Sequence, residues 1–238
     1  MVEFINLNRK NIIITGTSNG IGLELARKFL KSGNFVWGCS RSKSNISHNN
    51  YKHIVLNLEK KNEIERWIKK VSKESSNIID LLILNAAYYE RNLNYFETEK
   101  NIVKTISINL ISSILIAKKI SKLMIKNNSG MILFFSSSAV VVKDIGTSTY
   151  SSSKIAIETF AEILNKELKK FKVKTFIFRI NYLKTRLSKD MKKNDIKRLL
   201  NKFKTNIFSN TNKVYIKITK LFNNKIQNQN ILISDKLR

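Results

Sequence analysis

The two residues with the clearest chemical potential are Tyr150 and Lys154, at the two ends of the run Tyr-Ser-Ser-Ser-Lys. Residues four apart on an α-helix lie on the same face, one turn from each other. A free tyrosine titrates at about 10, so a neighbouring ammonium that favours the phenolate is expected to lower the pKa of Tyr150. The phenol would then serve as general acid for carbonyl reduction or as general base for alcohol oxidation. The same spacing also arises by chance in solvated surface pairs.

Two further polar residues precede this pair at places that suit the same chemistry. Ser137 follows the apolar run Met131–Phe135, and α/β sheets bind ligands at the carboxyl ends of their strands. A hydroxyl there can hydrogen-bond a substrate oxygen and stabilise its developing negative charge. Asn109 lies within a long predicted helix. A buried Asn in a helix needs a partner, for example a water that leads toward Lys154.

These residues belong to an alternation of short apolar runs and longer amphipathic segments. Strands are expected at 11–15, 34–40, 53–57, 78–84, 131–135, 173–180 and 231–234, and helices at 21–32, 59–75, 100–127 and 150–171, with a basic, mostly helical stretch at 188–222. The alternation indicates an α/β fold, in which helices cover both faces of a parallel sheet. The chain has no internal repeat and no linker rich in Gly, Ser or Pro, so residues 1–238 are expected to form a single domain.

The first predicted strand runs into a glycine-spaced turn, Thr-Gly-Thr-Ser-Asn-Gly-Ile-Gly, over residues 15–22. Gly16 allows a sharp turn, Gly20 allows the backbone to approach a pyrophosphate, and Gly22 allows close packing of the helix on the sheet. The helix that follows offers unpaired N–H groups and the positive end of its dipole to phosphates. Glycines in this pattern are a weak signal by themselves, and a strand-to-helix turn without a ligand is the alternative.

The end of the second predicted strand, Ser40-Arg41 with Lys43 nearby, indicates which dinucleotide is bound. Dinucleotide folds that prefer NAD place an acidic residue here to bind the ribose hydroxyls. A cation and a hydroxyl suit a 2′-phosphate instead, so NADP(H) is favoured over NAD(H). An ordinary surface arginine is the alternative in a chain so rich in cations.

Composition limits the partners. The net charge of +27 alone would suggest nucleic acid or an anionic membrane. Lysine is spread along the whole chain, however, with much Asn and Ile and no Pro, as an AT-rich genome would produce, so no nucleic-acid partner is expected. One cysteine and two histidines leave no internal disulfide and no metal site. No apolar run is long enough for a membrane span and the N-terminus lacks a signal-peptide core, so a cytoplasmic location is expected.

With its motifs in this order, the chain resembles the short-chain dehydrogenase/reductase family over about residues 9–235. The turn at 15–22 matches the family's TGxxxGxG motif, and Asn85-Ala86-Ala87 corresponds to its NNAG motif, which stabilises the central sheet. The resemblance implies a Rossmann-like doubly wound sheet of about seven strands. It also implies an NAD(P)-dependent oxidoreductase that acts on CH-OH or C=O groups. The four catalytic positions of the family are matched by Asn109, Ser137, Tyr150 and Lys154.

The resemblance assigns roles to these residues. Tyr150 donates the proton and Ser137 holds the substrate oxygen. Lys154 binds the nicotinamide ribose and tunes Tyr150, while Asn109 anchors a water in the proton relay. The residues implied to bind the cofactor are Gly16, Thr17, Ser18, Asn19, Gly20, Ile21, Gly22, Arg41, Asn57, Leu58, Asn85, Ala86, Tyr150, Lys154, Leu183 and Thr185.

The sequence departs from the family pattern at several positions. Leu84 and Ala87 replace the first Asn and the Gly of NNAG, and Asn57 stands where an Asp often contacts adenine. Ile180-Asn181 replaces a Pro-Gly, and this change is expected to loosen the seat of the nicotinamide. Near the C-terminus, Ser-Asp-Lys at 234–236 replaces a DGG that supports the family's tetramer. A homodimer or homotetramer is still expected.

The substrate is the least determined feature of the sequence. A small-molecule carbonyl or alcohol is expected, and a substrate lid at about 186–208. The resemblance favours a 3-oxoacyl-[acyl-carrier-protein] reductase, with a reductase of a sugar or nucleotide-sugar intermediate and a catalytically weak cofactor-binding sensor or scaffold as alternatives. Five apolar or aromatic residues are expected to border the substrate pocket, with packing in the core as the alternative: Tyr88, Tyr89, Val140, Val141 and Tyr182. The predicted lid is rich in basic residues, which would either attract an acidic acyl-carrier protein or a phosphorylated substrate or merely be solvated. These residues are Arg186, Lys189, Lys192, Lys193, Lys197, Arg198, Lys202 and Lys204.

Overall fold

The computed structural model of the protein describes residues 8–180, 211–222 and 230–233. Its centre is a seven-stranded sheet in the order β3-β2-β1-β4-β5-β6-β7, and every neighbouring pair of strands is parallel. The predicted doubly wound α/β fold is therefore confirmed. The strands are β1 (Asn11–Thr15), β2 (Phe35–Ser40), β3 (Tyr51–Val55), β4 (Leu81–Leu84), β5 (Gly130–Ser137), β6 (Val173–Ile180) and β7 (Asn230–Ile233).

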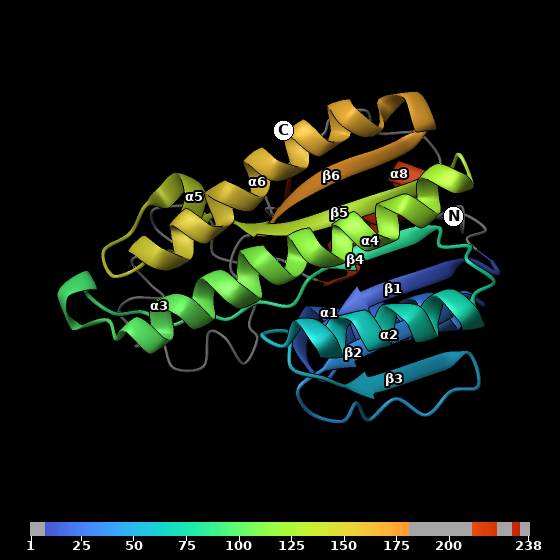
Figure 1. Ribbon diagram of the computed structural model, residues 1–238, viewed down its shortest axis with the longest axis horizontal. Coiled ribbons are helices and arrows are strands. Elements are labelled where there is room, and N and C mark those ends of the chain that lie inside the picture. The colour runs from blue at the N-terminus through green and yellow to red at the C-terminus, as the bar shows by residue number, and fades with distance from the viewer. Residues whose placement is uncertain (1–7, 181–210, 223–229, 234–238) are drawn as a thin grey trace.

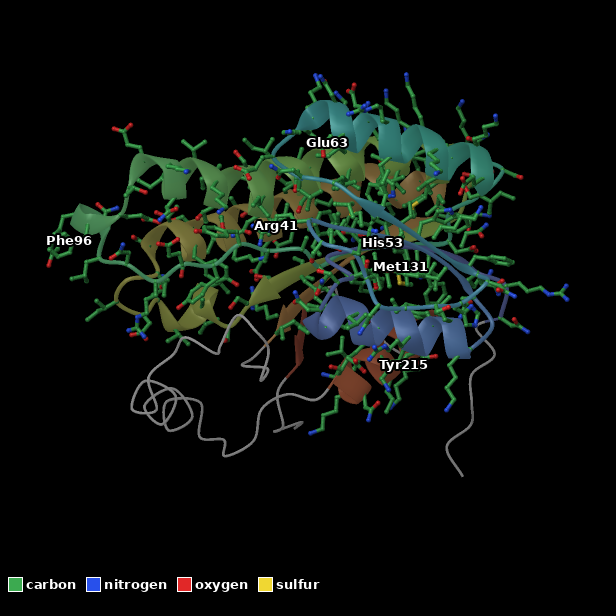
Figure 2. All side chains as sticks on the ribbon, turned by 90° about the horizontal axis from the view of Figure 1, so that it is seen from below. Arg41, His53, Glu63, Phe96, Met131 and Tyr215 are labelled. Carbon is green, nitrogen blue, oxygen red and sulfur yellow. The ribbon has the colours of Figure 1, made fainter. Side chains whose placement is uncertain are left out.

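Helices cover both faces of the sheet (Figure 1). One face carries α1 (Gly20–Lys31) and α8 (Thr211–Phe222), and the other carries α2 (Lys61–Glu74), α4 (Ser112–Lys126) and α6 (Ser148–Leu168). Each helix layer forms its own apolar core against the sheet, and Figure 2 shows the sheet between the two layers.

The sequence of the central strands explains their position. Ile12, Ile13 and Ile14 of β1 are all 0% exposed, and all four residues of β4, Leu81–Leu84, are buried. Strands covered on both faces are apolar throughout, whereas a strand with one wet face alternates. The amphipathic helices complete the packing with one apolar stripe each, which on α2 includes Ile64 and Trp67.

The structure departs from the predicted elements at places that matter for the site. β3 ends at Val55, because the chain turns at Asn57, whose N–H donates to Glu63 Oε2 (2.7 Å) and whose Oδ1 accepts from the Glu59 N–H (3.0 Å). β5 continues through Ser137, two residues further than expected. The helix predicted at 100–127 consists of α3 (Glu99–Ile106), a π-helical turn (Ser107–Ile111) and α4.

Short helical turns complete the described part of the chain: η1 (Asn94–Phe96), α5 (Ala139–Val142) and η3 (Lys169–Phe171). The predicted lid at about 186–208 lies outside the described residues, as does the stretch expected at 188–222 except for α8. Across the ranges that the structure describes, no helix combines the length and apolar character that a membrane crossing requires.

Candidate active site

The strand order determines where a ligand can reach the sheet. β1 and β4 are neighbours at its centre, and the chain leaves β1 into α1 on one face but leaves β4 toward the helices of the other face. At such a switch point the connections diverge beyond the carboxyl ends of the strands, which is where open α/β sheets bind ligands. The glycine turn follows β1 at this edge, Asn85 follows β4, and Ser137 ends β5.

Tyr150 and Lys154 lie one turn apart near the beginning of α6, beside the end of β5. Lys154 is 3% exposed, and its Nζ donates a hydrogen bond to the Phe135 carbonyl oxygen (2.9 Å). The same Nζ lies 5.9 Å from the centroid of the Tyr150 ring. The Ser137 hydroxyl is hydrogen-bonded to the Tyr150 phenol and accepts the Ala139 N–H (3.1 Å). The structure thus brings the predicted phenol, ammonium and hydroxyl into one site.

Burial dominates the titration of both groups. Desolvation raises the pKa of Tyr150 to about 12, although the hydrogen bond from Ser137 acts in the opposite direction and the nearby Tyr89 adds to the rise. Desolvation lowers the pKa of Lys154 to about 8, partly offset by the carboxylate of Glu158. The expectation that the ammonium lowers the pKa of Tyr150 is wrong for this structure, because the Lys154 Nζ is bound to the Phe135 carbonyl and burial of the phenol prevails.

Asn109 lies in the π-helical turn and is 1% exposed. Its Oδ1 accepts the Tyr88 N–H (2.8 Å), and its Nδ2 donates to the Tyr88 carbonyl (2.9 Å) and to Ser153 Oγ (3.1 Å). Ser153 Oγ in turn donates to the Tyr150 carbonyl (2.7 Å). π-helical turns inserted in helices are frequent at functional sites, and this one ties the chain after β4 to the first turns of α6.

The glycine turn has the geometry that a pyrophosphate needs. Gly16 adopts φ +80°, and a Cβ added at Gly22 would lie 2.2 Å from the Gly16 carbonyl oxygen, so neither position admits a side chain. Asn85 holds the turn, since its Nδ2 donates to the Thr15 carbonyl (2.9 Å). α1 begins without a side-chain cap at Asn19 and without an acidic residue in its first turn. Its first N–H groups and its dipole therefore fit a phosphate ligand.

A second set of contacts supports this turn and was not predicted. Thr17 is fully buried, and its hydroxyl accepts a hydrogen bond from Tyr51 Oη (2.9 Å), while Ser44 Oγ donates to the Thr17 carbonyl (3.0 Å). A Cβ at Gly38 would lie 2.4 Å from Thr17 Oγ1 and 2.6 Å from Tyr51 Oη. The sequence held one signal, because a glycine inside a strand often marks a close approach of other groups.

The cofactor-specificity positions are only partly arranged as predicted. Arg41 is exposed just past β2 (Figure 2). Burial and Glu90 raise the pKa of Tyr88, beyond β4, to about 12, and the positive charge of Arg41 opposes that rise. The Ser40 hydroxyl, expected to suit a 2′-phosphate, instead donates to the Ser42 carbonyl (2.9 Å) and is bonded to His53 Nε2 (2.7 Å). The Ser40 hydroxyl is therefore engaged within the protein, whereas Arg41 is exposed.

Of the other residues predicted to bind the cofactor or to border the substrate pocket, some lie beside Tyr150, some pack in the core and some are exposed. Asn57 uses its Oδ1 within its own turn, and Leu58 is 9% exposed and packs in the core. Tyr89 stands edge-on to Tyr150, with ring centroids 4.8 Å apart at 82°. Val140 is buried and Val141 is exposed. The predicted positions outside the described residues are Tyr182, Leu183, Thr185 and the basic lid residues.

A parallel sheet of this order, with a glycine turn after its first strand, is the architecture of dinucleotide-binding α/β proteins. The chain belongs to the short-chain dehydrogenase/reductase family, because residues 10–196 match the family model for short chain dehydrogenase. It is accordingly an NAD(P)-dependent oxidoreductase that acts on CH-OH or C=O groups, with a nucleotide cofactor and a small-molecule substrate.

Particular relatives show how far this likeness extends. The chain is 33% identical over 173 residues to the 3-oxoacyl-[acyl-carrier-protein] reductase FabG of Buchnera aphidicola subsp. Acyrthosiphon pisum, covering 69% of each chain. The fold superposes on a 4-hydroxyisoleucine dehydrogenase complexed with NADH at a TM-score of 0.85 and 18% identity, covering 95% of this chain and 97% of that one. A protein of Beutenbergia cavernae with bound NADP at low occupancy gives a TM-score of 0.85 at 15% identity, covering 97% of both.

Proposed function

We propose that this enzyme uses NADP(H) to reduce the 3-oxo group of an acyl thioester, with Tyr150 as the proton donor. The observation that carries the proposal is the cluster in which the half-buried Tyr150 phenol meets the Ser137 hydroxyl, one helical turn from the buried Lys154. The thioester substrate is supported by the likeness to a 3-oxoacyl-[acyl-carrier-protein] reductase at 33% identity.

In this proposal the residues divide the work of the reduction. A bound nicotinamide supplies the hydride, and the protein supplies orientation and electrostatics. Ser137 holds the substrate oxygen, and the phenol of Tyr150 gives it a proton. The phenol of Tyr150, whose pKa burial raises to about 12, is protonated at neutral pH, as a proton donor must be. Asn109 anchors the Tyr88 backbone and, through Ser153, the first turns of α6.

The experiment that tests the substrate is NADPH oxidation against a panel of carbonyl compounds. Acetoacetyl thioesters are expected to be reduced faster than keto sugars, quinones and simple diketones. Turnover of a keto sugar alone would replace this proposal by the sugar-reductase alternative. Tight NADPH binding without oxidation by any member of the panel would favour a cofactor-binding sensor or scaffold.

NADP(H) preference is proposed to depend on Arg41, the exposed cation past β2. Arg41→Asp is expected to shift the ratio of kcat/KM for NADPH over NADH toward NADH by about 10- to 100-fold, because a charge-assisted contact with the 2′-phosphate becomes a repulsion. Steady-state kinetics with both cofactors measures the ratio. Lys69→Asp, which removes an exposed cation in the second half of α2, is the matched control. An unchanged ratio in Arg41→Asp would contradict the assignment.

Self-association is proposed through the outer face of α3, the π-helical turn and α6, which lie side by side (Figure 1). Four apolar side chains are exposed there: Val103 (62%), Ile111 (48%), Ile155 (42%) and Ile163 (52%). An Ile155→Asp/Ile163→Asp double variant is expected to sediment as a single chain of 27.6 kDa, whereas the parent sediments as a dimer or tetramer. Ile216→Asp, on α8 across the sheet, is the control. A parent protein that is monomeric would refute this proposal.

A cytoplasmic location is proposed as well. Among the described residues Cys39 is a free and buried thiol, and burial raises its pKa. A protein that works without disulfides suits a reducing compartment.

A further inference from the structure

The described part of the chain buries only two charged side chains, Lys154 and Glu158, which are 3% and 6% exposed. They have opposite charges and lie four residues apart on α6. Tyr150, Lys154 and Glu158 therefore form a row along one face of that helix, with one turn between successive members. Lys154 belongs to the proposed catalytic site, whereas the proposed function has given Glu158 no role.

Glu158 is held in place by Arg179 on the neighbouring strand β6. Arg179 Nε donates to Glu158 Oε1 (2.8 Å) and Arg179 Nη2 donates to Glu158 Oε2 (2.6 Å), which is a bidentate pair. The carboxylate side chain is 9% exposed and the guanidinium 29%, so the arginine reaches water while the glutamate does not. In the sheet register Arg179 lies opposite Ser136, next to the predicted substrate-binding Ser137.

A buried ion pair is a weak source of stability, because desolvation of the charges offsets much of their attraction, and apolar residues of similar volume often do as well. The position of this pair, one turn from a buried lysine, gives it a different use. A carboxylate near an ammonium favours the charged form of the amine. A guanidinium bound to that carboxylate weakens the effect, since the pair has no net charge.

We propose that Glu158, clamped by Arg179, is a positioning residue that acts electrostatically across one helical turn to keep the amine of Lys154 charged beside Tyr150. The inference rests on the proposed function, in which Tyr150 donates the proton one helical turn from Lys154, and it adds that the charged amine of Lys154 supports that transfer. The carboxylate of Glu158 also opposes the fall that burial causes in the pKa of Lys154. Glu158 thus acts through Lys154 and does not itself touch the reacting atoms.

The groups that bear on Lys154 come from three directions. α6 contributes Tyr150 and Glu158, with Glu162 one turn further along, and β6 contributes Arg179, on which Glu162 also acts. β5 contributes an uncharged group, the Phe135 carbonyl, which accepts the hydrogen bond from Lys154 Nζ.

The test uses two substitutions that break the same ion pair from opposite sides. In Glu158→Gln the ammonium loses its carboxylate, so the pKa of Lys154 is expected to fall by about one unit. In Arg179→Gln the carboxylate is no longer neutralised, so the pKa of Lys154 is expected to rise. Loss of a merely structural pair would move both variants in the same direction or leave the titration unchanged. Arg179→Lys retains the charge and is expected to titrate near the parent.

Two measurements report the shifts. Carbon-13 NMR of protein labelled at the lysine Cε carbon follows the amine titration without cofactor, and the Lys154 signal is the one missing in Lys154→Arg. The high-pH limb of NADPH-dependent reduction is expected to move in the same direction as that titration. Glu65→Gln, which removes a carboxylate from a surface pair with Lys119 (3.3 Å), is the matched control and is expected to change neither.

The outcomes separate this inference from the proposed function. Opposite shifts in Glu158→Gln and Arg179→Gln support the tuning of Lys154, and equal or absent shifts overturn it. Opposite shifts together with an active Tyr150→Phe variant would support the tuning but refute the proton-donor role. Arg179 is partly exposed and can be hydrated when unpaired, so Glu158→Gln is expected to fold. If Arg179→Gln does not fold, the comparison of Glu158→Gln with Arg179→Lys tests the inference. The pKa of Lys154 is then expected to fall in Glu158→Gln and to stay near the parent value in Arg179→Lys.

Discussion

Tyr150→Phe is expected to lower kcat for carbonyl reduction by about 1,000-fold, which corresponds to about 4 kcal/mol of transition-state stabilisation. The substitution removes one oxygen, the proposed proton donor and the partner of the Ser137 hydroxyl. It keeps the ring, so the edge-on contact with Tyr89 at 4.8 Å is retained. NADPH binding, measured by fluorescence titration, is expected to stay near the parent value because the glycine turn and Arg41 are untouched.

The matched control for this variant is Tyr215→Phe. Tyr215 lies on α8, on the opposite side of the sheet (Figure 2), and its phenol is also bonded to a serine hydroxyl, that of Ser32 (2.6 Å). The control loses the same kind of hydrogen bond away from the site, so its kcat is expected to match the parent. A Tyr150→Phe enzyme that keeps more than about a tenth of its activity would show that another group supplies the proton.

The fold was predictable because its signals are local. Strands buried on both faces are apolar without interruption, as at Ile12–Ile14 and Leu81–Leu84, and such runs can be recognised without knowledge of their neighbours. The helices between them carry an apolar stripe at helical spacing. Boundaries were less predictable where a side chain decides them. β3 ends early because Asn57 bonds to Glu59 and Glu63 in the next turn of the chain.

The partners of the site residues were not predictable, because they come from distant parts of the sequence. Thr17 meets Tyr51, 34 residues away, and Arg179 meets Glu158, 21 residues away. The pattern Tyr-x-x-x-Lys correctly placed two side chains on one helix face, but it could not show where the lysine amine is bound. That amine is bonded to the Phe135 carbonyl, 19 residues away. Burial of the phenol therefore outweighed the charge effect that spacing alone suggested.

Lys154→Met is expected to abolish most of the reductase activity and, at the same time, to stabilise the protein at neutral pH. The difference between the ordinary lysine pKa of 10.5 and the value of about 8 in the folded protein corresponds to about 3 kcal/mol of destabilisation by the buried charge. Methionine keeps the straight-chain packing without the charge, but the hydrogen bond to Phe135 is lost. We therefore expect a net gain of about 1–2 kcal/mol in the free energy of unfolding.

The pH dependence of the free energy of unfolding tests whether the buried charge of Lys154 destabilises the folded protein. Between pH 8 and 10.5 the unfolded chain keeps a proton on Lys154 that the folded protein has released, so the stability of the parent is expected to rise with pH across this range. Lys154→Met is expected to lack that contribution, and the gain over the parent should shrink from pH 7 to pH 10. Denaturant unfolding at several pH values measures both curves. Lys119→Met, at a surface ion pair with Glu65, is the control and is expected to leave the pH dependence unchanged. A Lys154→Met protein that is less stable than the parent at pH 7 would mean that the hydrogen bond of the ammonium to the Phe135 carbonyl and its electrostatic attraction to Glu158 outweigh its desolvation.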